Sequence, residues 1–365
     1  MRIAYYTSNR TTIPADPSQV AASTTVTLNI IKELSKRHEI TLYAAKGSRV
    51  EGVNIVDLNL PPFEIDSSIG DGDWITKAVL GIKQIYIGEI FKNSGSYDII
   101  HLQTEPVYLG MPYVDLIKTP VLFTSHNVSH KYEEPIFKYF DAKIYISMIS
   151  QSQAKTYPLT QSTPVIYNGV DVDKYPFYEN SKGYYLFLGR LTKEKGIYEY
   201  LRLAEINKKD LFYVAGIGPE LKYVENFSKK HNNVKIIGML EREKKEWFDL
   251  IGNAHALILP IQWEEPFGLV MIESMSCGTP VIAYNRGAVP EIVKDGESGF
   301  ITKKNEIENL QECIKILKSM SNTQYPQIRK QSRIHAEQFF TAATMAKEYE
   351  KLYMSIIEDY KSRNI

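Results

Sequence analysis

Cysteine is scarce in this sequence, with two residues among 365. So low a count excludes a fold held together by a disulfide framework. Cys277 lies in an apolar run and Cys313 on a helical pattern, so we interpret both as small core residues. A chain of this length with 44% hydrophobic residues can fill two cores, and we therefore expect two domains.

An excess of charge of either sign is also missing, because 43 Lys and Arg residues balance 43 Asp and Glu residues. This balance argues against a nucleic-acid binder that depends on phosphate contacts. The N-terminus MRIAYYTSNR has no long apolar segment of a signal peptide, and no run reaches the roughly 18 apolar residues that cross a bilayer. We expect a cytoplasmic protein, with contact at the inner membrane face left open.

Short β-branched and aromatic runs alternate with helical patterns along the chain, and the series restarts near residue 184. The strands predicted in the first half are residues 2–6, 40–45, 99–102, 121–124 and 143–146. Those predicted in the second half are residues 184–188, 211–215, 234–237, 256–259 and 281–283. This alternation predicts an α/β protein of two Rossmann-like, doubly wound domains. We place them at residues 1–170 and 171–344, followed by a long amphipathic helix over 345–360.

Two carboxylates, Glu265 and Glu273, stand out in the mostly apolar stretch PIQWEEPFGLVMIESMSCGTP, with seven residues between them. Pro266 suits the first turn of a helix, apolar spacing continues to Ser276, and Gly278 is a natural stop. Eight helical steps separate the acids by roughly 12 Å along the axis. A hydrolytic pair needs its carboxyls closer, at about 5 to 10 Å. The spacing therefore disfavours both a hydrolytic pair and a shared metal.

The start of this helix is instead a candidate anion site. Helical amides at Phe267, Gly268 and Leu269 have no intrahelical partner and attract negative charge. An acid on each side of a bound diphosphate could hold hydroxyls at both ends of a nucleotide sugar. Two acids on a solvated helix face remain the alternative at this point.

The run WEEPFGLVMIESMSCGTPVIAYNRGAVPEIVKDGESGF, with its pair of acids spaced E-x7-E, resembles the donor-site signature of retaining glycosyltransferases of family four, which have the GT-B fold. The resemblance covers most of the second domain, about 190 residues. It implies two Rossmann-like domains facing across a cleft, with the last helix crossing back so that residues 345–365 join the first domain. It also implies that Glu265 contacts the transferred sugar and Glu273 the nucleotide ribose.

Further stretches agree with this resemblance. The segment 188–196, LGRLTKEKG, follows a predicted strand. Two of its three cations match those that bind the donor diphosphate in the family, which assigns Arg190 and Lys195 to that role beside Gly189. They would also stabilise the leaving nucleotide. Solvated loop cations are the alternative reading. In the family such cations take the place of a divalent metal, and no Asp-x-Asp pair lies near the site, so we expect neither a metal nor another cofactor.

Weaker signals mark the nucleotide side of the site. Gly216 and Gly218 form a Gly-x-Gly loop after a strand, which resembles the nucleotide-side loop of the family but is also typical of an ordinary turn. Met239 and Leu240 match the segment that contacts the base. The donor is expected to be linked to UDP or GDP.

Two histidines end predicted strands of the first domain, where open α/β sheets place ligand sites. A lone histidine is more often structural, but His126 resembles the interdomain histidine of the family that contacts the donor sugar. We therefore favour His126 over His101. One departure concerns the Gly-Gly-x-Glu segment that often opens the first helix of the family, because residues 18–25 read SQVAASTT and lack those glycines.

The predicted function is metal-independent transfer of a sugar from a nucleotide diphosphate to an acceptor hydroxyl, with anomeric configuration retained. The acceptor would be a glycan, a glycolipid or a small molecule. The Lys-bearing apolar helix over 74–87 would touch a membrane if the acceptor is lipid-linked, although a helix of this kind is more often part of the core. The rival hypotheses are another GT-B enzyme, such as a phosphorylase or nucleotide-sugar epimerase, and a non-catalytic nucleotide-sugar-binding protein.

Overall fold

The computed structural model describes residues 1–16, 22–63 and 72–363. The chain divides into two compact units, which are treated separately here. Unit 1 comprises Met1–Asn168 and Ala342–Ile365, and unit 2 comprises Gly169–Thr341. Within the described residues, no helix carries an apolar stretch long enough to cross a bilayer.

Unit 1 contains a six-stranded parallel sheet in the order β3-β2-β1-β4-β5-β6. Its strands are β1 (Arg2–Tyr6), β2 (Glu39–Tyr43), β3 (Asn54–Val56), β4 (Ile99–Leu102), β5 (Val121–Thr124) and β6 (Tyr145–Ser147). Its helices are α1 (Ala22–Leu34), α2 (Gly72–Lys92), α3 (Glu134–Phe140), α4 (Gln151–Ala154) and α12 (Ala342–Arg363), with 3-10 turns at Ser94–Ser96 and Val107–Leu116.

Unit 2 contains a second six-stranded parallel sheet in the order β12-β11-β10-β7-β8-β9. Its strands are β7 (Tyr184–Leu188), β8 (Leu211–Ala215), β9 (Val234–Gly238), β10 (Ala254–Leu259), β11 (Val281–Ala283) and β12 (Gly299–Ile301). Its helices are α5 (Ile197–Ile206), α6 (Leu221–Ser228), α7 (Lys245–Gly252), α8 (Leu269–Ser276), α9 (Val289–Ile292), α10 (Ile307–Ser319) and α11 (Gln324–Phe339), with a 3-10 turn at Val172–Lys174.

These two parallel α/β sheets confirm the predicted fold class. The central strands β1, β4, β5, β7 and β10 are almost entirely buried, which is why they read in the sequence as continuous apolar runs rather than alternating ones. The sequence predicted neither β3 nor β12, because each has only three residues and too short a pattern. Part of the departure at residues 18–25 lies outside the described residues.

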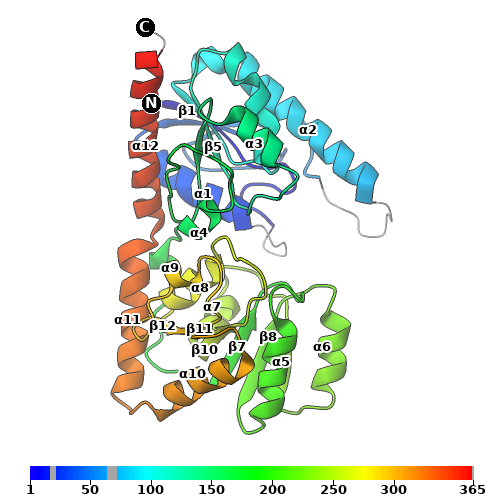
Figure 1. Ribbon diagram of the computed structural model, residues 1–365, viewed down its shortest axis with the longest axis vertical. Coiled ribbons are helices and arrows are strands. Elements are labelled where there is room, and N and C mark those ends of the chain that lie inside the picture. The colour runs from blue at the N-terminus through cyan, green and yellow to red at the C-terminus, as the bar shows by residue number, and fades with distance from the viewer. Residues whose placement is uncertain (17–21, 64–71, 364–365) are drawn as a thin grey trace. The chain divides into compact units, whose positions relative to one another are not determined.

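The C-terminal helix α12 belongs to unit 1, as the resemblance implied. It packs beside α1, and Figure 1 shows it running along that helix and the sheet of unit 1. Glu350 of α12 accepts hydrogen bonds from Arg37 at 2.9 Å and pairs with His38 at 2.6 Å. The Tyr353 hydroxyl lies 2.6 Å from Nδ1 of the buried His101. The apolar stripe of this helix therefore completes the core of unit 1.

Helix α2 is longer than the predicted range, and its apolar side is used within unit 1. Tyr86, Ile87 and Ile90 are fully buried, and the Lys83 ammonium is buried with them, donating to the backbone carbonyl of Glu105. Burial lowers the pKa of Lys83 to about 8. Ile85 is left exposed on the opposite side.

A buried arginine ties α11 to the sheet of unit 2. The Arg329 side chain is fully buried and donates to the backbone carbonyls of Tyr178 at 2.8 Å, Ala254 at 2.9 Å and Gly252. It also reaches the Tyr325 hydroxyl at 3.0 Å. A guanidinium can satisfy several carbonyls at once because its donors form a fixed planar fork. Arg329 thus closes the amino end of β10 against α11.

Replacing Arg329 by methionine should destabilise the protein by at least about 3 kcal/mol, because three buried carbonyls lose their donor. Urea unfolding followed by circular dichroism measures this change. Lys330→Met, at the exposed neighbouring position, is the matched control and should stay within about 0.5 kcal/mol of the wild type. Equal stability of the two variants would contradict the role given to Arg329.

His255, beside Arg329, makes the stability of unit 2 depend on pH. Burial lowers its pKa to about 4, and the Arg329 charge adds to the effect. The unfolded chain protonates this histidine near pH 6.5, so between pH 6.5 and 4 unfolding takes up a proton and stability falls as the pH falls. Its ring stacks on Tyr325, with centroids 4.4 Å apart, and its Nδ1 lies 3.1 Å from Ser181 Oγ.

We expect the free energy of unfolding to drop between pH 7 and pH 5, with His255 contributing about 1–2 kcal/mol of the loss. In the His255→Gln variant the drop should be smaller by that amount, since no imidazole is left to protonate. Urea unfolding at the two pH values measures it, with His130→Gln, at an exposed position, as the control. An unchanged pH dependence in His255→Gln would refute the assignment.

Candidate functional site

The candidate donor-site residues of unit 2 lie in loops that follow neighbouring parallel strands. From β7 the chain proceeds to β8 on one side, while β10, reached later, pairs with β7 on the other. The gap between β7 and β10 is therefore the switch point of the sheet, where open α/β folds bind their ligands at the carboxyl ends of the strands. Arg190 and Lys195 follow β7, and Glu265 follows β10.

Lys195 and Glu265 meet at this switch point in an ion pair between Nζ and Oε2. The Trp263 indole N–H donates to the same Oε2 at 3.0 Å, and Nζ lies 4.9 Å from the centroid of the Trp263 ring. Glu265 is only 7% exposed, so its charge depends on these two donors. The structure thus brings together the predicted phosphate cation and the predicted sugar ligand.

The loops that carry this pair touch backbone to backbone. Gly196 has a φ of +81°, and a Cβ at this position would lie 1.8 Å from the carbonyl oxygen of Pro260. The Gln262 amide donates to the Glu194 carbonyl at 2.8 Å, which holds the loops together on the other side of Lys195. Only glycine permits so close an approach, and the approach sets the position of the ion pair.

The Gly-x-Gly loop after β8 packs against the loop after β7 and against the end of β9. A Cβ on Gly216 would lie 1.8 Å from the carbonyl oxygen of Gly189, and one on Gly218 would lie 2.5 Å from that of Leu191. The Gly216 amide donates to the Gly238 carbonyl at 2.8 Å. Both glycines are thus explained by close packing against the loop after β7.

Met239 and Leu240 follow β9 directly and are both half-buried. Arg190, which begins the loop after β7, is exposed. These residues share the carboxyl edge of the sheet with Lys195, because all six strands are parallel. The edge therefore presents an exposed cation, a glycine loop and two half-buried apolar side chains.

The second acid, Glu273, lies on α8 and is 1% exposed. Its Oε1 accepts from the Arg242 guanidinium and from the Tyr175 hydroxyl at 3.2 Å. Arg242 packs its guanidinium over the Trp247 ring at 5.1 Å, and burial lowers its pKa. Glu273 thus has charge partners within unit 2, from the loop after β9.

One part of the predicted geometry was wrong. Helix α8 begins at Leu269, not at Pro266, and its cap is Gly268 in the left-handed region with a φ of +84°. Glu265 therefore precedes the helix instead of starting it, and Phe267 is a buried loop residue. The reason is that the loop must turn back over Glu265 before the helix can start, and Gly268 makes that turn. The start of the helix therefore moves to Leu269.

In unit 1 the two histidines at strand ends differ in their surroundings. His101 is fully buried, with its ring between the Tyr353 hydroxyl and Thr124 Oγ1, which is 2.7 Å from Nε2. It is a core residue. His126 follows β5, is half-buried, and has its Nε2 3.3 Å from Gln103 Oε1. Burial lowers the pKa of His126 to about 4, so its ring is neutral at pH 7.

The loop of His126 is fixed by a buried carboxylate. Glu105, after β4, accepts from the His126 amide at 2.8 Å and from Ser125 Oγ at 3.1 Å. Burial raises the pKa of Glu105, and these hydrogen bonds act in the opposite direction. The carboxyl ends of β4 and β5 therefore hold His126 in one place at the edge of the sheet in unit 1.

Three residues that contact the two acids directly in the structure were not predicted from the sequence. Trp263 was read only as part of a motif, although a tryptophan in a polar loop is a signal in itself. Arg242 lies in the charged run EREKKE, where nothing distinguishes it from solvated neighbours. Tyr175 lies 98 residues from Glu273, and no local pattern connects them.

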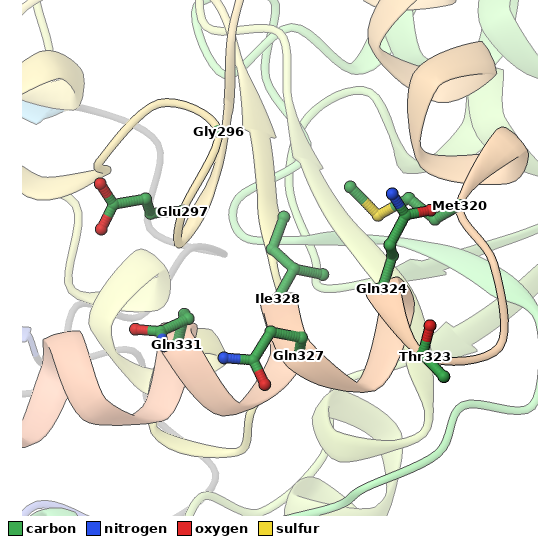
Figure 2. A pocket seen from close by; sticks show the side chains of 8 residues that line it. All are labelled: Gly296, Glu297, Met320, Thr323, Gln324, Gln327, Ile328 and Gln331. Atoms are coloured by element: carbon green, nitrogen blue, oxygen red, sulfur yellow. The ribbon is translucent and has the colours of Figure 1, made fainter.

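A separate hollow of about 390 Å³ lies elsewhere in unit 2 (Figure 2). Its lining comes from the turn before β12, the end of α10 and one face of α11, and consists of Gly296, Glu297, Met320, Thr323, Gln324, Gln327, Ile328 and Gln331. The turn at Gly296 precedes β12, so the hollow belongs to the amino edge of the parallel sheet, opposite the switch-point loops. Its lining has one carboxylate and no cation, which does not suit a diphosphate.

Comparison with known proteins points to one family. The family described as Glycosyl transferases group 1 matches residues 173–335, and the family described as Glycosyltransferase Family 4 matches residues 23–174. An uncharacterized glycosyltransferase of Methanocaldococcus jannaschii is 35% identical over 43% of this chain, and the glycogen synthase of Mycobacterium tuberculosis is 28% identical over 41%. The matches span 44% and 38% of those two relatives, less than half of either.

A solved structure gives the same answer for the fold. The Anabaena protein HepE, in its complex with UDP-glucose, superposes with a TM-score of 0.73 at 17% identity over 97% of this chain and 100% of HepE. The two family matches together run from residue 23 to residue 335. The chain therefore belongs to family four of the glycosyltransferases and has their GT-B fold.

Proposed function

We propose that this chain is a retaining glycosyltransferase that moves a sugar from a nucleotide diphosphate to an acceptor hydroxyl. The observation that carries the proposal is the ion pair of the half-buried Lys195 with the buried Glu265 at the switch point of the unit 2 sheet. A cation suited to phosphate and a carboxylate suited to sugar hydroxyls lie there in direct contact. A nucleotide sugar needs both at the junction between its diphosphate and its sugar.

In this proposal Lys195 and Arg190 neutralise the diphosphate and stabilise the charge that develops on the leaving nucleotide. Lys195 would exchange Glu265 for phosphate oxygens when the donor binds. The carboxylate released from that pair then accepts hydrogen bonds from the sugar. Catalysis would come from orientation and charge stabilisation, with the leaving phosphate helping to deprotonate the acceptor, so that no protein carboxylate attacks the sugar.

The nucleotide would lie along the loops after β8 and β9. Glu273 is proposed as the ribose ligand, with Arg242 and Tyr175 holding its carboxylate. Met239 and Leu240 offer apolar contact to the base. The Anabaena structure with UDP-glucose supports a uridine diphosphate sugar as the first donor to test. The acceptor is proposed to be a glycan or a lipid-linked sugar, and His126 to contact the donor sugar, as the family resemblance implies.

Replacing Lys195 by alanine should lower kcat/KM at least 100-fold, because the phosphate loses a cation held at the switch point. Release of UDP from UDP-glucose, UDP-galactose, UDP-N-acetylglucosamine or GDP from GDP-mannose measures turnover even without an identified acceptor. Lys193→Ala, two residues away on the same loop and exposed, is the matched control and should keep wild-type turnover. Near-normal turnover of a correctly folded Lys195→Ala variant would contradict the proposal.

Donor binding should not need a divalent metal, since Arg190 and Lys195 supply the positive charge. Titration calorimetry with UDP, in the presence of a chelator and then of excess Mg²⁺, should give dissociation constants within about twofold of each other. Loss of UDP binding in the chelator would contradict the metal-independent mechanism.

A further inference from the structure

The Oε2 atom of Glu265 is the acceptor for two donors from different positions of unit 2. Lys195 Nζ comes from the loop after β7, and Trp263 Nε1, at 3.0 Å, comes from the same loop as Glu265 itself. Within the described part of the chain, no hydrogen bond reaches the other oxygen, Oε1, of this 7% exposed carboxylate. A carboxylate oxygen offers two lone pairs, so Oε2 is saturated and Oε1 is open.

Of these two hydrogen-bond donors, only the indole can stay in place when a nucleotide sugar binds. The ammonium of Lys195 is drawn to phosphate oxygens, whereas a neutral indole N–H has no comparable attraction to a dianion. Once Lys195 turns to the diphosphate, Trp263 is left as the group that holds Oε2. Its ring, 4.9 Å from Nζ, also gives the ammonium a favourable surface on either side of this exchange.

The backbone around Trp263 is fixed on both sides, so the indole has a defined direction. The Gln262 amide donates to the Glu194 carbonyl at 2.8 Å, and the Ala288 amide donates to the Glu265 carbonyl at 2.8 Å. A Cβ on Gly287 would lie 2.3 Å from the Glu265 amide nitrogen, so the loop after β11 presses directly on this segment. A loop clamped in this way can present one carboxylate oxygen reproducibly.

We propose that Trp263 is a positioning residue for the donor sugar. Its N–H holds Oε2 of Glu265, so that Oε1 is the oxygen presented to a sugar hydroxyl, and this fixes which hydroxyl of the sugar is recognised. The inference rests on the proposed function, because it assigns the sugar to Glu265. In this inference Trp263 sets the selectivity for the sugar through Glu265 and does not contact the diphosphate.

The test compares Trp263→Phe with a control that makes the same substitution in unit 1, Trp74→Phe. Phenylalanine keeps an aromatic ring and removes only the N–H with part of the ring. Trp74 belongs to helix α2 of unit 1, so the control removes an indole N–H outside the unit that carries Glu265 and Glu273. Calorimetry gives the dissociation constants of UDP, UDP-glucose and the four monodeoxy analogues of UDP-glucose for each full-length protein.

In the wild type, at least one deoxy analogue should bind about tenfold more weakly than UDP-glucose, which identifies the hydroxyl that Glu265 accepts. In Trp263→Phe, UDP-glucose should bind about tenfold more weakly than it does to the wild type. The analogue that lacks that hydroxyl should bind this variant less than threefold more weakly than UDP-glucose does. The affinity for UDP should stay within about twofold in both variants. Trp74→Phe should keep the tenfold discrimination of the wild type.

Full discrimination between UDP-glucose and its deoxy analogues in Trp263→Phe would overturn the inference and leave the proposed function standing. An equal loss of UDP and UDP-glucose binding would also overturn it, because it would show a structural role instead. A wild type that binds neither UDP nor UDP-glucose, but binds GDP and GDP-mannose, moves the same comparison to GDP-mannose and its deoxy analogues. Binding of none of these compounds would overturn the proposed function, and the inference with it.

Discussion

The ion pair between Lys195 and Glu265 is the interaction on which the candidate site depends. The two residues lie 70 positions apart in the chain, and they meet because β7 and β10 are neighbours whose loops touch at Gly196. Removing either charge would leave the other buried with an incomplete set of partners, which is costly in a water-poor environment. The close contact of the loops therefore sets the position of the ion pair, and the two features depend on each other.

Both acids of the site are neutralised by cations from other loops. Glu265 pairs with Lys195, and Glu273 pairs with Arg242, each beside a tryptophan ring. A diphosphate would have to compete for Lys195, whereas the pair at Glu273 can persist, since the carboxylate has further lone pairs for hydroxyl donors. The first pair thus suits an exchange of partners, and the second suits a fixed anchor.

Unit 1 uses buried polar groups in a different way. His101, Tyr353 and Thr124 form hydrogen bonds that attach α12 to the sheet, and burial keeps His101 neutral by lowering its pKa. Both ring nitrogens of His101 have hydrogen-bond partners in this network. The network therefore adds specificity to the docking of α12 on the sheet. His126, two residues beyond the end of β5, is half-buried at the carboxyl edge of that sheet.

The sequence alone determined most of the strands and the two parallel sheets, because apolar runs are local patterns, and it singled out both acids of the candidate site through the E-x7-E motif. It misplaced the start of α8, since the turn at Gly268 depends on how the loop folds over Glu265. Only the tertiary structure decided that Trp263 and Lys195 share one oxygen of Glu265, and that Arg242 and Tyr175 hold Glu273. These contacts depend on which strands become neighbours and how closely their loops approach, and no spacing along the chain encodes either.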